Sequence, residues 1–331
     1  MGNQRIRILI TGAGGQDGLL IANHHLTLGD TVFCVSRTAP TAAFGKLQNN
    51  GVQLFYNKNI QWFFTRLDSL QETLKILEII KPEKIYHLAG VHGPSGTLVK
   101  ISEDFASEMY RVHVSLTQYF IDWCSNNPTT KLVVALSAKI FSPKNDLEIV
   151  DSLSEVNPEN YYGETKALAY EKIKLAQLSG LSIYAAILFP HSSPLSKEGF
   201  LLPHLANQLL IAKNSSRPVI KINSAFASVD ISDARDVCLA IVELSNLEFS
   251  TNSVIGSGYS LRIDSLINEA AANFELNEII IESNRFLNDS CLIASKSEIK
   301  LNLPNWAGSR PILSTLIDIV TFKEHGKLKL S

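Results

Sequence analysis

Residues 11–18 read Thr11-Gly12-Ala13-Gly14-Gly15-Gln16-Asp17-Gly18, and they follow a short apolar run at 6–10. The glycines have the spacing GxxGxxG. The first allows a tight strand-to-helix turn, the second lets backbone N–H groups approach a pyrophosphate, and the third lets the helix pack closely on the strand. The N-terminus of the following helix adds partial positive charge for phosphates. The stretch therefore predicts a dinucleotide site formed by Gly12, Gly14, Gly15, Gln16, Asp17 and Gly18.

Strand-like and helical segments alternate from this turn as far as residue 189. The expected strands are 6–10, 31–35, one within 53–65, 84–88, 131–136 and 181–189. The expected helices are 19–28, 69–80, 104–126 and 159–179. Such alternation predicts an α/β fold with a Rossmann-like, doubly wound parallel sheet that has helices on both faces.

The rhythm changes after residue 190. Helical patterns occupy 202–212, 234–244 and 263–273, and short strands are expected at 219–222 and 254–255. We therefore expect two parts that share an interface. Residues 1–189 form the NAD(P)-binding domain, and residues 190–331 form a smaller C-terminal α/β substrate cap with segments that return to the main sheet.

Composition excludes several classes of function. The 331 residues carry a formal net charge of −2 and no basic block, so nucleic acid is not an expected partner. The four cysteines are far apart and form no CxxC pair, which predicts no metal site and no disulfide framework. The sequence contains no signal-peptide pattern and no apolar run long enough to cross a membrane. We expect a cytoplasmic protein.

The end of the second expected strand bears on cofactor choice. An acidic residue there would accept the ribose hydroxyls of NAD, whereas this chain has Val35-Ser36-Arg37-Thr38. Arg37 can pair with a 2′-phosphate, so NADP is favoured over NAD. The alternative is a solvated surface arginine.

Tyr162 and Lys166 lie one helical turn apart in the stretch Asn160-Tyr161-Tyr162-Gly163-Glu164-Thr165-Lys166. A tyrosine has an unperturbed pKa of about 10, and a neighbouring ammonium favours its phenolate. Tyr162 can then exchange a proton with a hydroxyl or ketone while hydride moves at the same carbon. Ser137 ends its strand at the sheet edge where open α/β sheets bind ligands, and it can hydrogen-bond the same oxygen.

With these motifs in place, the chain resembles the extended short-chain dehydrogenase/reductase family, most closely the GDP-mannose 4,6-dehydratases. The resemblance spans nearly the whole chain. The matching segments are 11–18 (TGxxGQDG), 81–90 (KPxxIYNLxA), 162–166 (YGxxK), 187–194 (ILFNHESP), 234–237 and 260–262.

The resemblance implies a GDP-linked nucleotide sugar as substrate and a homo-oligomer, either a dimer or a tetramer. It also implies a cycle. Hydride leaves sugar C4 for NADP, a base removes the C5 proton, water is lost from C6, and the hydride returns to C6. By the same resemblance, further residues line the cofactor: Leu88, Ala89, Gly90, Leu188 and His191. His191 and Arg262 are expected to meet the substrate.

The chain departs from the family where substrate chemistry takes place. The family's eliminating Glu aligns with Lys139, and a protonated ammonium is not a base unless burial lowers its pKa substantially. The family's phosphate-binding arginines align with Leu195, Ser196 and Val229, and Pro190 replaces an Asn. In the cofactor half, Arg66 stands where an Asp is common.

Several functions remain open at this point. A nucleotide-sugar enzyme is favoured, with Lys139 directing the expectation from a 4,6-dehydratase (a lyase) toward a 4-keto-sugar reductase or epimerase. A dehydrogenase of a non-nucleotide sugar is the second reading. A catalytically degenerate paralogue that serves in binding or assembly is the third.

Overall fold

The structure is a computed structural model. It describes residues 5–37, 57–92, 101–276, 278–284, 290–306, 308 and 310–326. Within this part of the chain, no helix is both long and apolar enough to cross a lipid bilayer.

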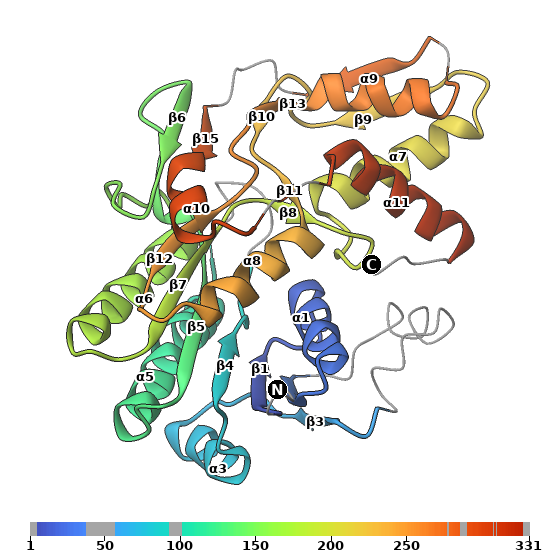
Figure 1. Ribbon diagram of the computed structural model, residues 1–331. Helices are drawn as coiled ribbons and strands as arrows, with labels where there is room; N and C mark the ends of the chain where they lie inside the picture. The colour runs from blue at the N-terminus through green and yellow to red at the C-terminus, as the bar shows by residue number, and fades with distance from the viewer. Residues whose placement is uncertain are drawn as a thin grey trace.

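A seven-stranded parallel sheet forms the centre of the molecule, in the order β12-β7-β5-β4-β1-β2-β3 (Figure 1). The order reverses between β1 and β4, which creates the crevice where doubly wound sheets bind ligands. The strands are β1 (Arg7–Thr11), β2 (Thr31–Ser36), β3 (Ile60–Phe64), β4 (Lys84–His87), β5 (Lys131–Ser137), β7 (Ile183–Leu188) and β12 (Asn252–Ile255). The predicted Rossmann-like sheet is confirmed.

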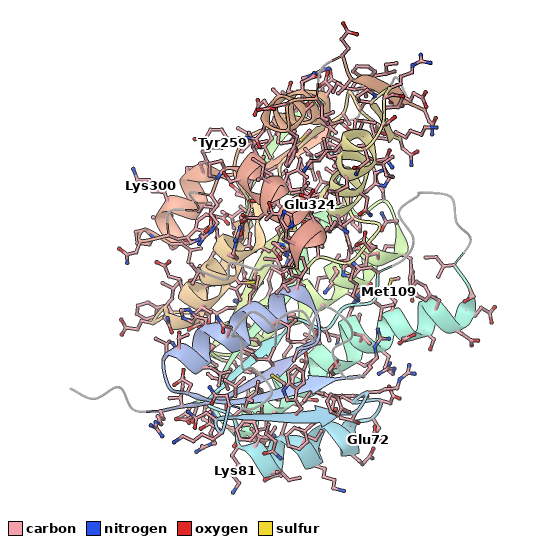
Figure 2. The ribbon with its side chains drawn as sticks, turned by 90° about the vertical axis from the view of Figure 1, so that its right-hand side faces the viewer. Glu72, Lys81, Met109, Tyr259, Lys300 and Glu324 are labelled. Carbon is pink, nitrogen blue, oxygen red and sulfur yellow. The ribbon has the colours of Figure 1, made fainter. Side chains whose placement is uncertain are left out.

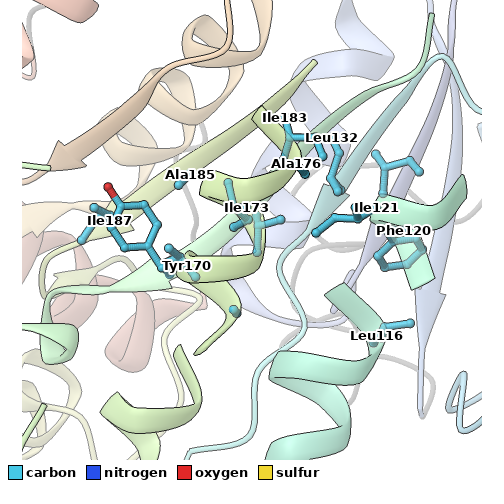
Figure 3. Close-up of a cluster of buried hydrophobic side chains, with 14 of the residues drawn as sticks. Leu116, Phe120, Ile121, Leu132, Tyr170, Ile173, Ala176, Ile183, Ala185 and Ile187 are labelled. Atoms are coloured by element: carbon cyan, nitrogen blue, oxygen red, sulfur yellow. The ribbon is translucent and has the colours of Figure 1, made fainter. Parts of the chain in front are cut away.

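Helices cover both faces of the sheet (Figure 1). One face carries α1 (Gln16–Thr27) and α8 (Ala234–Asn246). The other carries α3 (Leu70–Ile80), α5 (Leu116–Asn126) and α6 (Tyr161–Leu178). Alternate residues of each strand point to opposite faces of the sheet, and each face has its own hydrophobic core. Ile8 and Ile10 pack toward α1, while Leu9 packs toward α5. Figure 3 shows the core on the face of the sheet that α3, α5 and α6 cover, where Phe120, Leu132, Tyr170 and Ile173 are buried together.

A wide π-helical turn interrupts the long helix predicted at 104–126. The helix begins as α4 (Glu103–Tyr110), passes through the π turn η1 (Arg111–Ser115) and continues as α5. Such turns are rare and occur frequently at functional sites.

A second core lies at the end of the molecule away from α3 (Figure 1). It is built from α7 (Leu201–Lys213), β9 (Val219–Ile222), α9 (Ile263–Asn273), β14 (Ile280–Ser283) and α11 (Ile312–His325). Figure 2 shows this separation, with Glu72 of α3 and Lys81 just after that helix at the lower end, and Tyr259 and Glu324 in the upper half. The later half of the chain also returns to the main sheet, because β12 pairs with β7 and α8 packs against α1.

Short strand pairs and one short helix complete the described part of the chain. They are β10 (Ser228–Val229) with β13 (Leu261–Arg262), β11 (Ser232–Asp233) with β8 (His191–Ser192), β15 (Cys291–Ala294) with β6 (Leu147–Val150), and α10 (Lys296–Asn302).

Besides the two-residue strands β8, β10, β11 and β13, several elements do not appear among the sequence-based predictions. They are β6, β14, β15, α10 and α11. The strands of this group are four residues long and pair with distant segments, so local periodicity is weak. Of the ambiguous region 53–65, residues 60–64 form β3, and 53–56 lie outside the described residues.

Candidate active site

The glycine turn has a shape that only glycine permits. Gly12 adopts a positive φ of 71°, and a β-carbon there would lie 2.7 Å from the backbone nitrogen of Ala89. A β-carbon on Gly18 would lie 2.5 Å from the Cα atom of Ala13. Gly15 donates its amide to the Gly12 carbonyl at 2.9 Å and caps α1 without a side-chain hydrogen bond. The bare N-terminus of α1 therefore faces the crevice and fits the pyrophosphate of a dinucleotide. Gly14 lies half-buried in the same turn.

The side chains of Gln16 and Asp17 point toward the segment after β7. Asp17 lies 3.2 Å from Nε2 of His191, whose Nδ1 donates to the carbonyl of Phe189 at 2.7 Å. Gln16 accepts hydrogen bonds from the hydroxyl groups of Ser193 and Ser196. The predicted cofactor residues Gln16, Asp17 and His191 thus join the glycine turn to the cap segment through their side chains.

The Asp17–His191 contact is an ion pair, because both imidazole nitrogens face acceptors. Burial works against the charged imidazole, but the charge and hydrogen bond of Asp17 outweigh it and raise the pKa of His191. Burial likewise works against the carboxylate, but His191 outweighs it and lowers the pKa of Asp17.

The carboxyl ends of neighbouring strands bring the other predicted residues to one edge. Ser137 at the end of β5 is paired in register with Leu188 at the end of β7. Leu88, Ala89 and Gly90 follow β4 beside the glycine turn, where Leu88 donates to the Thr11 carbonyl at 3.2 Å. The crevice predicted from the motifs is therefore lined by the strand ends that the sequence indicates.

Tyr162 meets Ser137 because the start of α6 docks on the end of β5. Asn160 caps α6 and accepts the amide of Gly163 at 3.0 Å. A β-carbon on Gly163 would lie 2.2 Å from the carbonyl oxygen of Lys139, so this contact requires glycine. Burial raises the pKa of Tyr162 to about 12, against the opposing effect of its hydrogen bond with Ser137. In the resting site Tyr162 is a phenol.

Lys166 is buried one turn after Tyr162, with a 5% exposed surface. Its Nζ donates to the carbonyl oxygen of Ala135 at 2.7 Å. Burial lowers the pKa of Lys166 to about 7, so the ammonium and amine forms are of similar abundance near neutral pH. The predicted group Ser137, Tyr162 and Lys166 is thus brought together at one site.

Lys139 lies in the short 3-10 turn after β5 (Ala138–Ile140), and its side chain is exposed. Its backbone amide donates to Oγ of Ser137 at 3.2 Å. The structure therefore does not give Lys139 the burial on which a basic amine would depend. Its catalytic role stays a prediction.

Arg37 lies at the end of β2 and pairs with Glu108 of α4 at 2.8 Å. Arg66 reaches the same carboxylate oxygen at 3.1 Å, and Arg111 lies 2.6 Å from the carboxylate of Asp68. In this arginine cluster (Arg37, Arg66 and Arg111), Arg37 and Arg66 follow the carboxyl ends of β2 and β3, the edge that would face an adenosine ribose, and Arg111 begins the π turn.

Arg262 is exposed in β13 and pairs with Asp264 through two contacts of 3.0 and 2.7 Å. Its guanidinium also lies 6.0 Å from the ring centroid of Phe226. These contacts lie at the second core. The binding of a substrate by Arg262 stays a prediction.

Two histidines whose rings border Tyr162, His92 and His113, were not among the site residues expected from the sequence. The His92 ring lies 5.2 Å from the Tyr162 ring, and the His113 ring meets it edge-on at 5.3 Å. His113 belongs to the π turn, which no local signal in the sequence reveals. In the sequence, His113 is a single histidine among apolar residues of the helix predicted at 104–126, and this pattern does not indicate an active-site position.

A doubly wound sheet with a glycine turn and a Ser-Tyr-Lys group at its carboxyl edge defines an extended short-chain dehydrogenase/reductase. More narrowly, a family model for GDP-mannose 4,6 dehydratase matches residues 9–301, and the chain belongs to that family.

Known relatives are distant in sequence. GDP-mannose 4,6 dehydratase from Homo sapiens is 25% identical over 228 residues, which cover 67% of this chain and 57% of the human protein. The matched part thus spans little more than half the length of that relative.

Solved structures share the fold across almost the whole chain. The dTDP-glucose 4,6-dehydratase of Bacillus anthracis, solved in complex with NAD, has a TM-score of 0.79 at 14% identity and covers 97% of both chains. The UDP-N-acetylglucosamine 4-epimerase of Methanobrevibacter ruminantium has a TM-score of 0.77 at 18% identity, with 97% of this chain and 99% of the epimerase covered.

Proposed function

We propose that this protein binds a nicotinamide dinucleotide and catalyses hydride transfer at C4 of a nucleotide-linked sugar. The observation that carries the proposal is the buried Lys166 one turn from Tyr162, with Ser137 hydrogen-bonded to that tyrosine at the sheet edge beside the glycine turn. Family membership supports the same class of reaction.

The proposed proton chemistry follows from the environments of these side chains. The bound dinucleotide supplies the hydride acceptor. The Tyr162 phenolate takes the proton of the sugar hydroxyl as the hydrogen on the same carbon leaves as hydride, and Ser137 holds that oxygen. The Lys166 ammonium stabilises the phenolate, because positive charge lowers the tyrosine pKa that burial has raised to about 12.

The exposed Lys139 favours a 4-keto-sugar reductase or 4-epimerase over a dehydratase. Dehydration needs a carboxylate or another base to remove the C5 proton, and this chain has an exposed lysine where the family has a glutamate. Reduction or epimerisation at C4 needs only the hydride, Tyr162 and Ser137.

We propose a GDP-linked sugar as substrate, with Arg262 as its phosphate contact. The residues aligned with the family's other phosphate-binding positions support a weaker phosphate site. Leu195 is buried in the core beneath α8, and Ser196 donates to Gln16. A non-nucleotide sugar is therefore the second candidate, since it needs fewer cationic contacts.

For the cofactor we propose NADP, because Arg37 can pair with a 2′-phosphate. Glu108 supports the alternative, since a carboxylate beside the ribose would accept the 2′-hydroxyl of NAD. The choice depends on whether Arg37 exchanges Glu108 for the phosphate.

We further propose a cytoplasmic homo-oligomer, a dimer or tetramer. All four cysteines are free and buried, which suits a reducing compartment. The outer face of α6 exposes Leu168, Leu175 and Leu178 at 41, 66 and 86%, which a second copy could cover. Light scattering coupled to size exclusion tests the mass in solution.

One experiment tests the proposed activity. Purified protein is incubated with GDP-mannose, its 4-keto derivative and a panel of other sugar nucleotides, with either NADP(H) or NAD(H). Product mass and cofactor absorbance are recorded. A C4-oxidised, C4-reduced or C4-epimerised product supports the proposal, whereas loss of water without net redox assigns a dehydratase.

Matched variants make this test specific. Tyr162→Phe should lower turnover by about 100-fold or more, while Tyr161→Phe at the neighbouring position should leave it near wild type. Lys139→Glu should introduce dehydration if that position selects the reaction. If no sugar nucleotide reacts and Tyr162→Phe has no effect on any substrate, the proposal is wrong and a binding or assembly role is the better description.

A further inference from the structure

A buried path of hydrogen bonds, with one peptide link between Val112 and His113, joins the glycine turn to the first turn of α6. Thr11 at the end of β1 bonds His87 at 2.8 Å, and Nε2 of His87 reaches the carbonyl of Val112 at 3.1 Å. From the next residue, Nδ1 of His113 reaches the hydroxyl of Thr165 at 2.8 Å. That hydroxyl donates to the carbonyl of Tyr162 at 3.0 Å.

The hydrogen-bond partners of His87 and His113 determine which ring nitrogen of each histidine carries the proton. The Val112 carbonyl can only accept, so Nε2 of His87 carries the hydrogen and Nδ1 accepts from the Thr11 hydroxyl. The amide of Val91 donates to Nε2 of His113 at 3.0 Å, so Nδ1 of His113 carries its hydrogen and donates to Thr165. Both rings are neutral, and they hold opposite tautomers.

The π turn of residues 111–115 makes this path possible. A wider turn changes which carbonyls and side chains the helix presents. His87 donates to the carbonyl of Val112, and the hydroxyl of Thr117 donates to the carbonyl of His113 at 2.7 Å. In the π turn, the successive carbonyls of Val112 and His113 therefore each accept a hydrogen bond from a side chain. The turn also points the ring of His113 toward α6.

The same rings limit the position of the Tyr162 side chain. His113 meets the phenol edge-on, and His92 lies against it at a centroid distance of 5.2 Å. Thr165 is fully buried between the two residues of the catalytic pair, Tyr162 and Lys166.

We infer that His87 and His113 are positioning residues that align Tyr162 with the cofactor crevice through the π turn and Thr165. This inference rests on the proposed role of Tyr162 as the proton-exchanging group. Neither histidine exchanges a proton in the reaction, since each nitrogen already has a fixed partner.

The test compares two substitutions at one position. His113→Phe keeps a ring but removes both hydrogen bonds, whereas His113→Gln offers an amide that can donate to Thr165 and accept from Val91. We expect His113→Phe to lower kcat about 10- to 100-fold with little change in cofactor Kd, and His113→Gln to recover most of the loss. His204→Phe, at a half-buried site in the second core, should leave kcat unchanged.

Two further measurements keep the inference testable. If His113→Phe does not fold, Thr165→Val removes only the hydroxyl link and should give the same fall in kcat. The carbon NMR titration of labelled tyrosines, with Tyr162 assigned by its Phe variant, needs no substrate. If the titration of the Tyr162 phenol is shifted in His113→Phe and returns to the wild-type value in His113→Gln, the result supports a positioning role even if no sugar reacts. Equal kcat in wild type and His113→Phe, an unshifted titration, or no recovery in His113→Gln would overturn the inference.

Discussion

A β-carbon on Gly163 would lie 2.2 Å from the carbonyl oxygen of Lys139, so glycine lets α6 dock on the strand end that carries Ser137. The residue after Tyr162 therefore controls how closely α6 approaches the end of β5, and with it the distance between Tyr162 and Ser137. The YGxxK motif encodes a packing contact as well as a spacing.

Gly163→Ala should move the start of α6 away from the end of β5. Because the obstacle is backbone, α6 must shift, and we expect about 1–3 kcal/mol of lost stability together with a loss of turnover of about tenfold or more. Denaturant unfolding and steady-state kinetics measure the two effects. Gly180→Ala is a useful comparison, since it tests a strained glycine with no atom near the added β-carbon. Full activity in Gly163→Ala would contradict the docking argument.

Lys166→Met should stabilise the protein while abolishing activity. Burial lowers the pKa of Lys166 from 10.5 to about 7, so folding disfavours the protonated form. The cost is fully present below about pH 7 and vanishes as pH rises above about 10.5, where the unfolded chain also loses the proton. At neutral pH, removing the ammonium by Lys166→Met should raise the free energy of unfolding by at most about 5 kcal/mol. Thermal unfolding at neutral and at strongly alkaline pH should show a gain in Tm that shrinks at the higher pH.

The Asp17–His191 pair should stabilise the fold within a limited pH window. His191 has a raised pKa, so its contribution is complete below its ordinary value of 6.5 and is lost as pH rises through the folded value. Asp17 has a lowered pKa, so its contribution is complete above 3.8 and is lost as pH falls through the folded value. A double-mutant cycle with Asp17→Asn and His191→Gln should give a coupling energy of about 1–3 kcal/mol near pH 5. A coupling that is no smaller at strongly alkaline pH would argue against an ion pair.

Glu108 and Arg37 should control cofactor preference in opposite directions. Arg37→Gln is expected to weaken NADP binding about tenfold or more while changing NAD binding little, because a 2′-phosphate gains most from the guanidinium. Glu108→Gln removes the carboxylate that occupies Arg37 and should favour NADP further. Calorimetric Kd values for both cofactors give the result. Unchanged NADP affinity in Arg37→Gln would remove the reason for preferring NADP.

Local sequence features were sufficient for the central sheet. The alternation through residue 189, the glycine turn and the Tyr162–Lys166 spacing each depend on neighbours within one element or one connection. The place of Ser137 at the ligand-binding edge of the sheet was also predictable, because carboxyl ends of parallel strands meet at one edge. The predicted helix at 263–273 agrees with α9 at both ends.

Pairings between distant segments were not predictable in this way. No periodicity indicates that β15 pairs with β6, or that Gln16 and Asp17 turn their side chains to residues 191–196. The π turn and the path through His87 and His113 depend on partners more than 20 residues away along the chain.

The sequence by itself determined the fold class and the glycine turn, and it singled out the residues of the proposed Ser-Tyr-Lys group, because backbone conformation and side-chain periodicity are local. Only the tertiary structure decided that Lys139 is exposed, that Lys166 is buried enough for its pKa to fall to about 7, and that the rings of His92 and His113 border Tyr162. Burial and hydrogen-bond partners arise from the packing of β5, α6 and the π turn, which are far apart along the chain.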